Sequence, residues 1–450
     1  MPVADSTTAI EAVFRIEFAR LVAGLTRFVG DVGLAEELAQ DALVDALVQW
    51  PEQGTPRKPG AWLMTVGKRK AIDRFRRDRL LDDKYVQLGR QGETHEPRSA
   101  APPGTHGTFE DHIDDDVLRL MFVACHPTLS VAARTALTLR LVGGLTTAEI
   151  ARAYLEPEAT VKQRILRAKR AISKAGVPFE VPEGEDRAAR LGSVLEVVYL
   201  IFNEGYSATA GADWTRPALC AEALRLGRVL AVLAPDEAEV HGLAALMEIQ
   251  SSRLRARRGP DGEPVLLHEQ DRRTWDRLLI NRGLAALDRV RALDGERGPH
   301  ALQAAIEACH VVAFRVEDTD WPRIDTLYGE LAEVAPSPIV ELNRAVAVSM
   351  AFGPEAGLDL VDQLGATGTL DGYHLLHGVR GDLLEQLGRS ADAAGEFRRA
   401  ASLTRNDREH QLLLDRADAL EDGPAPVVAA AVRYEPVSAG RARGPTARPS

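Results

Sequence analysis

Residues 146–172 read TTAEIARAYLEPEATVKQRILRAKRAI, two helical patterns separated by a Glu-Pro-Glu break. Thr146 and Glu149 have the spacing of a capping box, which predicts that a short helix begins there. Pro157 suits the first turn of a second helix, where its missing N–H costs nothing. The stretch therefore predicts two short helices joined by a tight turn.

The second predicted helix has one apolar and one basic face. At about 100° per residue, its apolar stripe would pack against the first helix; the stripe is Val161, Ile165, Ala168 and Ile172, and the first helix would turn inward Ile150, Ala151 and Leu155. The opposite face carries Gln163, Leu166, Arg167 and Arg170, flanked by Lys162, Arg164 and Lys169. Such a face can offer Arg and Gln to base edges and Lys and Arg to phosphates. We interpret the pair as a DNA-reading helix-turn-helix, and an ordinary helical hairpin with a basic solvent face is the alternative.

The composition predicts a soluble, all-α protein of several units. A chain of 450 residues exceeds one compact core, so roughly two to four units are expected. Aromatic residues make up 5%, and apolar residues recur at three- and four-residue spacing. We expect no membrane-spanning segment and no secretory signal. The widely spaced Cys125, Cys220 and Cys309 fit a reducing cytoplasm.

Positive charge is concentrated in two short segments of an acidic chain, whose formal net charge is -11. Residues 57–84 contain ten Lys or Arg and four Asp or Glu, and residues 134–174 contain nine and three, so each segment balances to +6. Residues 180–423 contain 26 and 42, a balance of -16. The two patches predict two separate contacts with a polyanion, with solvated helix faces as the alternative.

Breaks in the helical pattern divide the chain. Residues 85–116 are rich in Gly, Pro, Ser and Thr, which predicts a flexible linker, and residues 176–186 form a shorter break. From Gly423 onward the chain is rich in Pro, Ala and Arg, which predicts a disordered tail. The predicted domains are 1–84, 117–175 and 187–422, with the linker at 85–116 and the tail at 423–450.

Two modules of the chain resemble parts of one known family. RTALTLRLVGGLTTAEIARAYLEPEATVKQRILRAKRAI, residues 134–172, resembles region 4 of bacterial sigma factors of the extracytoplasmic-function (ECF) class. FARLVAGLTRFVGDVGLAEELAQDALVDALVQW, residues 18–50, is similar to regions 2.1 and 2.2, and GAWLMTVGKRKAIDRFRRDR, residues 60–79, to regions 2.3 and 2.4. The resemblance covers roughly the first 175 residues, with matching order, spacing and intervening linker.

The rest of the chain has the spacing of a helical repeat. Six residues fall at the offsets of the roughly 34-residue tetratricopeptide (TPR) repeat: Gly381, Leu384, Gly388, Ala393, Phe397 and Ala400. One ECF group carries such an extension, and this chain resembles it through ACHP (124–127), FNEGY (202–206) and HEQDRRTWD (268–276). We expect a TPR-like α-solenoid over residues 187–422, with a plain helical bundle as the alternative.

The resemblance implies a transcription initiation factor that binds core RNA polymerase and is not an enzyme. In the family, the region 2.2 helix docks on the largest polymerase subunit. Here that helix would keep Leu38, Ala42 and Ala46 in the domain core. The residues expected to contact polymerase are Glu37, Gln40, Asp41, Asp45 and Gln49, and simple solvation of the helix is the alternative role for these side chains.

The resemblance also implies contacts with two promoter DNA elements. For the −10 element the candidates are Lys68, Arg69, Lys70, Arg74, Arg76 and Arg77. Arg69 stands where the family often places Asn, and Arg can still stack on a base and hydrogen-bond it. Trp62 is expected in the core, beside Leu63, Val66 and Ile72. For the −35 element the candidates are Lys162, Gln163, Arg164, Leu166, Arg167 and Arg170, and Leu166 can touch a thymine methyl group.

No catalytic residue, metal or cofactor is predicted. Zinc takes about four ligands, and Cys125 with His126 has no companion pair, so we expect Cys125 in the core. Asn203, Glu204, His268 and Asp271 show no spacing of a nucleophile or cofactor loop.

Control in cis is the role expected of the C-terminal extension, which could mask or position the basic domains or bind a regulatory protein. No membrane partner is expected. Two other functions stay open: a helix-turn-helix transcriptional regulator with a TPR-like sensor domain, and a TPR scaffold that binds peptides.

Overall fold

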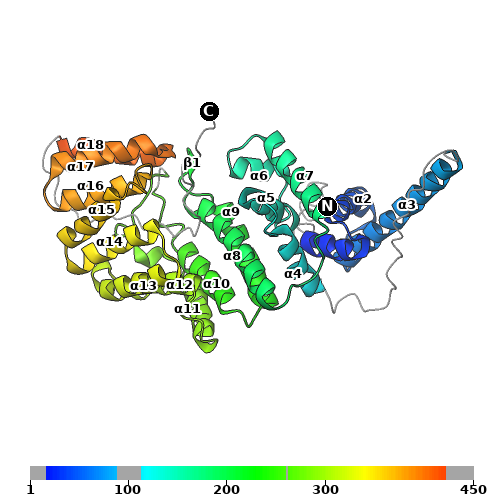
Figure 1. Ribbon diagram of the computed structural model, residues 1–450, viewed down its shortest axis with the longest axis horizontal. Helices are drawn as coiled ribbons and strands as arrows, with labels where there is room; N and C mark the ends of the chain where they lie inside the picture. The colour runs from blue at the N-terminus through cyan, green and yellow to red at the C-terminus, as the bar shows by residue number, and fades with distance from the viewer. Residues whose placement is uncertain (1–16, 89–112, 260–261, 422–450) are drawn as a thin grey trace. The chain divides into compact units, whose positions relative to one another are not determined.

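The computed structural model describes residues 17–88, 113–259 and 262–421 (Figure 1). The predicted all-α class is confirmed, because helices form nearly all of the regular structure in these residues. The chain divides into two compact units between Val197 and Val198, a boundary that lies inside helix α8 (Gly184–Tyr206). Among the helices described, none is long and apolar enough to cross a membrane.

The first unit contains both basic segments. A helix over residues 17–29 is followed by α2 (Val32–Gln53), α3 (Pro59–Leu88), α4 (Ile113–Ala124), α5 (Val131–Leu141), α6 (Thr147–Ala153) and α7 (Glu158–Ala175). Helices α3 and α4 extend into both ends of the segment predicted as a linker. Residues 89–112 in its middle, and the predicted tail, lie outside the described residues.

The start of α2 and its packing on α3 follow from local sequence. Asp31 caps α2 by accepting a hydrogen bond from the Leu34 amide at 2.8 Å. Leu38, Ala42 and Ala46 are buried, as predicted. Trp62 is half-buried, and its ring meets that of Trp50 edge-on with centroids 5.3 Å apart. Of the residues expected beside Trp62, Leu63 is buried but Ile72 is 41% exposed, because it lies in a part of α3 where Asp73 and Arg74 are also exposed to solvent.

The second unit is a succession of helices, and five of them begin with Pro in the first turn, where Pro is favoured. Its elements are α9 (Pro217–Leu233), α10 (Ala238–Ser251), α11 (Arg277–Ala292), α12 (Pro299–Val312), α13 (Trp321–Val334), α14 (Pro338–Phe352), α15 (Pro354–Ala366), α16 (His374–Gln386), α17 (Ser390–Leu403) and α18 (Asp407–Glu421), with short 3-10 helices at Arg272–Thr274 and Val316–Asp318. Each helix packs on the next along the chain. This is the neighbour-to-neighbour arrangement of a helical repeat protein.

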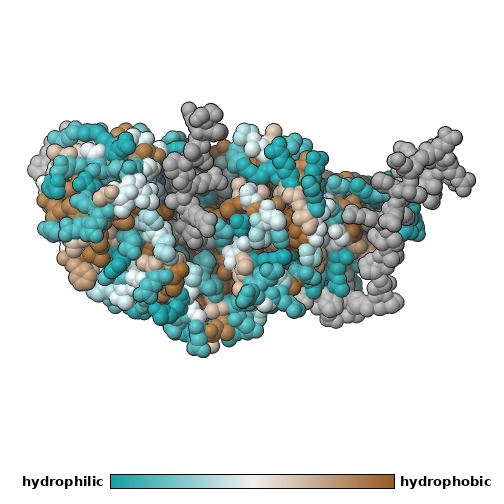
Figure 2. Space-filling model, in the orientation of Figure 1, coloured by the Kyte–Doolittle hydropathy of each residue, from teal (hydrophilic) through white to brown (hydrophobic). Residues whose placement is uncertain are grey.

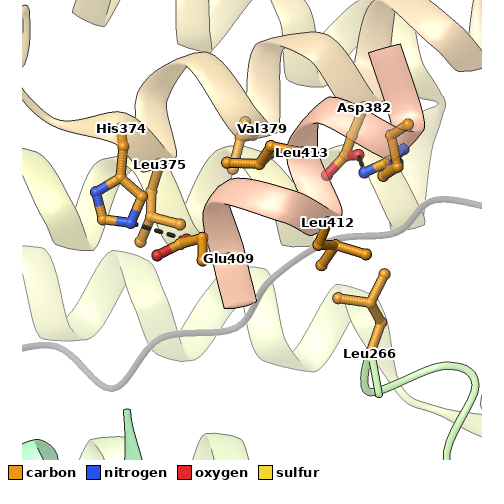
Figure 3. A pocket seen from close by; sticks show the side chains of 10 residues that line it. Leu266, His374, Leu375, Val379, Asp382, Glu409, Leu412 and Leu413 are labelled. Carbon is orange, nitrogen blue, oxygen red and sulfur yellow. Dashed lines mark hydrogen bonds and ion pairs between the residues drawn. The ribbon is translucent and has the colours of Figure 1, made fainter. Parts of the chain in front are cut away.

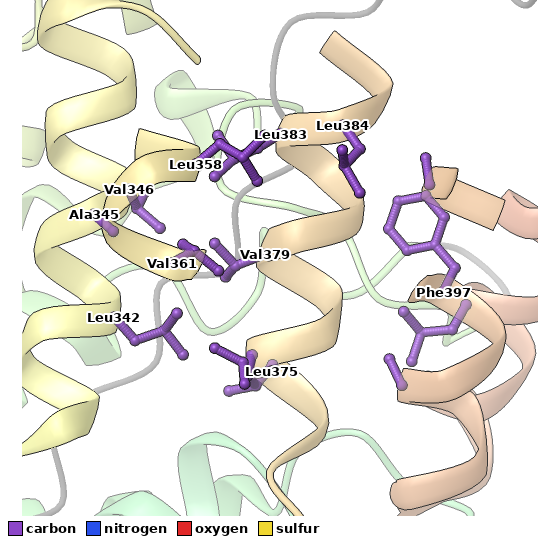
Figure 4. Close-up of a cluster of buried hydrophobic side chains, with 14 of the residues drawn as sticks. Leu342, Ala345, Val346, Leu358, Val361, Leu375, Val379, Leu383, Leu384 and Phe397 are labelled. Carbon is purple, nitrogen blue, oxygen red and sulfur yellow. The ribbon is translucent and has the colours of Figure 1, made fainter. Parts of the chain in front are cut away.

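The predicted repeat corresponds to helices α16 and α17. Leu384, Ala393, Phe397 and Ala400 are fully buried, and Figure 4 shows Leu375 and Val379 of α16 facing Leu342 and Val361 of the preceding helices. A Cβ on Gly381 would lie 2.6 Å from the Phe397 ring, so the two helices approach closely because residue 381 is small. Gly388, at φ +74°, forms the turn between them.

A short parallel pairing joins the beginning and end of the second unit. Strand β1 (Ala210–Gly211) pairs with β2 (Arg405–Asn406). The Asn406 side-chain amide donates hydrogen bonds to the carbonyls of Ala208, at 3.1 Å, and Asp213, at 2.9 Å. The start of the repeat array is therefore bonded to its last helices, and strands contribute almost nothing else to the described fold.

An ion pair is fully buried in the middle of the second unit. Arg253 and Glu307 are 1% and 0% exposed, and their charged atoms lie 2.6 Å apart. The Gln250 amide donates to the other Glu307 oxygen at 2.7 Å. A buried pair of this kind adds little net stability, but loss of either partner would leave an uncompensated buried charge. The face of the molecule shown in Figure 2 is largely hydrophilic and is interrupted by hydrophobic areas, as on most folded domains.

Candidate nucleic-acid interface

Helices α6 and α7 form the predicted helix pair. The capping box at the start of α6 is present: the Glu149 amide donates to the Thr146 hydroxyl at 3.1 Å, and the Thr146 amide donates to the Glu149 carboxylate at 2.7 Å. Pro157 is the residue immediately before α7 rather than a member of its first turn. The left-handed conformation of Leu155, φ 51°, makes the turn tight.

The apolar stripe of α7 is buried as predicted. Its four members, Val161, Ile165, Ala168 and Ile172, pack inward, and α7 contacts α5 and α6. Ile150 and Ala151 of α6 are also buried. The prediction for Leu155 was wrong: this side chain is 55% exposed, because the residue belongs to the turn and its positive φ points it away from the helix pair.

The outer face of α7 carries most of the predicted −35 residues. The exposed side chains are Lys162, Gln163, Leu166, Arg167 and Arg170. Arg164 is placed differently: its guanidinium donates two hydrogen bonds to the Glu156 carboxylate, at 3.0 and 2.6 Å, and it is only partly exposed. The structure therefore brings five of the six candidates to one solvent face, while Arg164 clamps the turn before α7.

A broad, open groove lies between the start of α5 and the outer face of α7. Its lining includes the hydroxyl residues Thr128 and Ser130 on one side and Gln163 and Arg167 on the other. Polar donors and a cation in one open groove can take a backbone segment of a polyanion. Helices α5 and α7 together therefore present a concave surface with basic side chains, in addition to the convex outer face of α7.

Helix α3 carries the predicted −10 residues. Arg69, Arg74, Arg76 and Arg77 are exposed, whereas Lys68 and Lys70 are partly exposed. The Lys68 ammonium lies 5.6 Å from the centre of the Phe28 ring, a cation–π contact that holds its stem against the domain.

The predicted DNA-binding residues of α3 and the predicted polymerase-binding residues of α2 are adjacent in the structure. Lys70 on α3 lies 3.0 Å from the carboxylate of Asp45 on α2, and Arg74 lies 3.0 Å from Glu37. Candidates for DNA binding and for polymerase binding are thus neighbours across the α2–α3 packing. Exposed pairs of this kind are weak, so the cations can exchange partners at low cost.

Helix α2 also carries an apolar surface that the sequence analysis missed. Val44, Leu47 and Val48 are 57%, 38% and 67% exposed. Their i, i+3, i+4 spacing places them on one side of the helix, next to the predicted contact residues Asp41 and Asp45. The core face of α2 already has its own apolar stripe. A second apolar stripe on the same helix could therefore have been recognised in the sequence as an exposed apolar surface.

The remaining candidates have separate local partners. Cys125 is buried beside Thr138, and burial raises the pKa of its thiol to about 12. Glu204 pairs with Arg216 and accepts from Thr209; burial raises its pKa, and the Arg216 charge opposes the shift. Asp271 caps the 3-10 helix Arg272–Thr274. These contacts assign structural roles to all three.

One pocket of the second unit lies between α16 and α18 (Figure 3). Leu266, Leu375 and Val379 supply apolar walls. The polar groups at its edge are already engaged: the His374 ring lies 3.0 Å from Glu409, and Asp382 pairs with Arg416. The pocket therefore resembles a packing defect between helices more than a polar binding site.

Comparisons with known proteins match the chain in three segments. Residues 16–80 match sigma-70 region 2, and residues 119–172 match sigma-70 region 4. Residues 190–291 match a family of unknown function, DUF6596. The two sigma-70 matches cover the α2–α3 surface and the α6–α7 pair described above.

Several curated proteins are similar to the chain. The ECF RNA polymerase sigma factor SigK of Mycobacterium sp. (strain KMS) is 28% identical over 165 residues, which are 35% of this chain and 77% of that protein. A probable ECF RNA polymerase sigma factor, SigI of Mycobacterium tuberculosis (strain ATCC 25618 / H37Rv), is 25% identical over 178 residues, 40% of this chain and 59% of that protein.

A further similarity extends through the second unit. An uncharacterised protein of Rhizobium meliloti (strain 1021) is 45% identical over 413 residues, 90% of this chain and 94% of that protein. The helical extension therefore recurs together with the two sigma-70 regions. No solved structure gives a significant match.

Proposed function

Because the chain belongs to the ECF class of the sigma-70 family, we propose that it binds core RNA polymerase and directs it to promoters through a −10 and a −35 element. The observation that carries this proposal is the two-faced helix α7. Its buried stripe holds it in the region 4 domain, and its outer face presents Arg, Lys and Gln to solvent. Sigma factors are initiation factors and not enzymes, so no catalytic step is proposed.

Helix α7 reads the −35 element in this proposal. Gln163 and Arg167 reach base edges from the exposed face, and Leu166 contacts a thymine methyl group. Lys162 and Arg170 bind phosphates on either side. Arg164 has a supporting role, because its bonds to Glu156 hold the turn that sets the angle of α7.

Helices α2 and α3 serve the −10 element and the polymerase. Arg69, Arg74, Arg76 and Arg77 are exposed on α3 and contact the DNA directly, while the partly exposed Lys68 and Lys70 add positive charge. On α2, the exposed Val44, Leu47 and Val48 share the helix with the polar residues expected to contact polymerase, which are Glu37, Gln40, Asp41, Asp45 and Gln49. An apolar centre with a polar rim is the usual anatomy of a protein interface.

The test is reconstituted transcription. Purified protein and core polymerase are incubated with a library of genomic promoter fragments, and transcripts are sequenced. We expect initiation at fragments that share one −35 and one −10 motif, and none with core polymerase alone. Binding of the protein to duplex DNA with no dependence on polymerase would instead favour the helix-turn-helix regulator with a sensor domain.

The C-terminal extension is proposed to control the sigma regions or to bind a regulatory protein. Its support is the charge difference: residues 180–423 balance to -16, whereas each basic segment balances to +6. The test is truncation after Val197, which retains Glu196 as the partner of buried Arg134 at 3.1 Å. Equal transcription and equal polymerase affinity of the truncated and full chains would refute a regulatory role.

A further inference from the structure

Glu36 is a carboxylate buried within the first unit. It lies on α2, one residue before the predicted polymerase contact Glu37, and is only 2% exposed. The Gln40 side chain donates to it at 2.5 Å. Carboxylates are rarely buried unless they are paired, so its partners define what this residue does.

Both cationic partners of Glu36 come from the region 4 domain. Arg140 of α5 donates from Nε to the Glu36 carboxylate at 2.6 Å, and Lys169 of α7 forms an ion pair with its other oxygen. The side chains of Arg140 and Lys169 are only 16% and 18% exposed. Burial lowers the pKa of both side chains. The negative charge of Glu149 acts in the opposite direction on Arg140, and that of Asp31 does so on Lys169. Two partly desolvated cations thus converge on one carboxylate.

Close packing surrounds this charge cluster. A Cβ built on Gly144 would lie 3.5 Å from the Phe18 ring, and one built on Gly33 would lie 3.7 Å from the stem of Lys169, so there is little free space on either side. Arg27 lies 3.6 Å from Asp116, which also pairs with Arg119. The region 2 and region 4 domains are therefore in direct contact through apolar as well as charged groups.

Promoter recognition requires a different arrangement. Elements centred near −10 and −35 are about 25 base pairs apart, which is roughly 85 Å along B-DNA at about 3.4 Å per base pair. A domain pair joined through single side-chain contacts cannot place α3 on one element and α7 on the other. The contact must open before both elements are bound.

We propose that Glu36, Arg140 and Lys169 form an ionic latch that holds the two promoter-reading domains closed, and that opening of the latch is required for promoter binding. Removal of the latch also frees Lys169, at the edge of the α7 reading face, for a DNA phosphate. The inhibitory effect rests on the proposed function, whereas the closed contact itself does not.

A disulfide across the contact provides the first test. A Cβ on Gly33 would lie 4.0 Å from Cβ of Lys169, within the range of about 3.5–4.5 Å found in disulfides. The full-length Gly33→Cys/Lys169→Cys variant is oxidised with diamide, which accepts the two electrons and two protons of the thiol pair. Burial raises the pKa of Cys125 and Cys220 to about 12 and of Cys309 to about 11, so the native thiols react slowly.

We expect the disulfide to form in the free protein and to lower transcription by about tenfold or more, with recovery after reduction. The Gly33→Cys single variant, treated with diamide, is the control and should keep its activity, and the reduced double variant is the reference for the effect of the cross-link. Failure of the pair to cross-link would overturn the closed contact, and full activity of the cross-linked protein would overturn its inhibitory role. If the wild-type protein starts no transcript, the proposed function fails, while the cross-linking yield still tests the contact.

A substitution that removes the negative charge of Glu36 tests whether the ion pairs hold the two domains together. Fluorophores on Glu52→Cys and Ser173→Cys, both exposed, report the distance between the domains in the full chain. Glu36→Gln should lower energy transfer, because two cations lose their carboxylate. Glu196→Gln is the matched control, since it breaks the 3.1 Å pair with Arg134 without touching α2. Unchanged transfer in a folded Glu36→Gln protein would contradict the latch. If that variant does not fold, Lys169→Met breaks the latch from the other side and must give the same loss of transfer.

Discussion

Arg164 and Arg167 are three residues apart on α7, yet their surroundings differ. The Arg164 guanidinium is held by Glu156, whereas Arg167 is exposed beside Gln163 in the groove next to α5. Helical spacing assigned both to a basic face. It could not reveal that the turn supplies a carboxylate within reach of only one of them, because that depends on how the chain folds back.

Substitution of Arg167 by Ala should weaken −35 recognition by about 1–3 kcal/mol and relax the preference at one base pair, since a bidentate contact to a base edge is lost. Transcription from promoters with single changes in the −35 motif measures this. Arg170→Ala is the control: loss of a phosphate contact should reduce all promoters alike. An unaltered base preference in Arg167→Ala would show that another residue reads the motif.

The exposed valine at position 48 supports a second prediction. Val48→Glu places a charge in the apolar centre of the α2 surface and should weaken core polymerase binding by about 2 kcal/mol or more, while the protein's own stability changes by less than about 0.5 kcal/mol. Fluorescence anisotropy with labelled protein measures the affinity. Val232→Glu, at a valine 72% exposed in the second unit, is the matched control. Equal loss in both variants would argue against a docking role for α2.

At the scale of elements, the close packing of α16 on α17 depends on Gly381 having no side chain. The Phe397 ring occupies the space next to Gly381, and both helices bury their apolar stripes in the same cluster. The repeat spacing identified these positions because a close helix crossing needs a small residue opposite a large one. Helix ends were less predictable, as the extension of α3 to Leu88 shows.

Gly381→Ala should destabilise the second unit by about 1–3 kcal/mol, because its new methyl group would lie 2.6 Å from the Phe397 ring and must displace it. The urea midpoint of the full chain is the measurement. Gly395 in α17 has no atom within 4 Å of its Cβ position. Gly395→Ala should therefore stabilise the protein by about 0.5–1 kcal/mol, as expected for a helix interior. The same sign of change in both variants would contradict the packing argument.

For the molecule as a whole, the buried histidines of the second unit link folding to pH. His310 is fully buried, and burial lowers its pKa well below the usual value, with Arg253 and Arg272 lowering it further. The pKa of His268 is also lowered, chiefly by burial. Both histidines therefore stay neutral in the folded chain at a pH where an unfolded chain binds protons.

The free energy of unfolding should fall as the pH drops below about 6.5, by up to about 1.4 kcal/mol per pH unit for each such histidine. The sign follows because the unfolded state then binds more protons than the folded state. Urea unfolding at pH 7.5, 6.5 and 5.5 tests this. His310→Phe removes the titrating group and should flatten the dependence, whatever its effect on stability at pH 7.5. A slope equal to that of the wild type would assign the effect to other groups.

The sequence by itself determined the helical class, the helix-turn-helix with its capping box and buried stripe, and the repeat at α16–α17. These features are local: they depend on residues within a few helical turns, where the periodicity of 3.6 and the capping rules act. The family resemblance followed from the same local patterns, and the matches to sigma-70 regions 2 and 4 confirm it.

Only the tertiary structure decided which charges meet. The Glu36 cluster joins residues 104 positions apart along the chain in its bond to Arg140, and Arg253 pairs with Glu307 across 54 positions. Local sequence assigns such residues to polar helix faces, because charged side chains are usually exposed to solvent. Their burial became favourable only when distant helices supplied the opposite charge, and that pairing is a property of the packed chain.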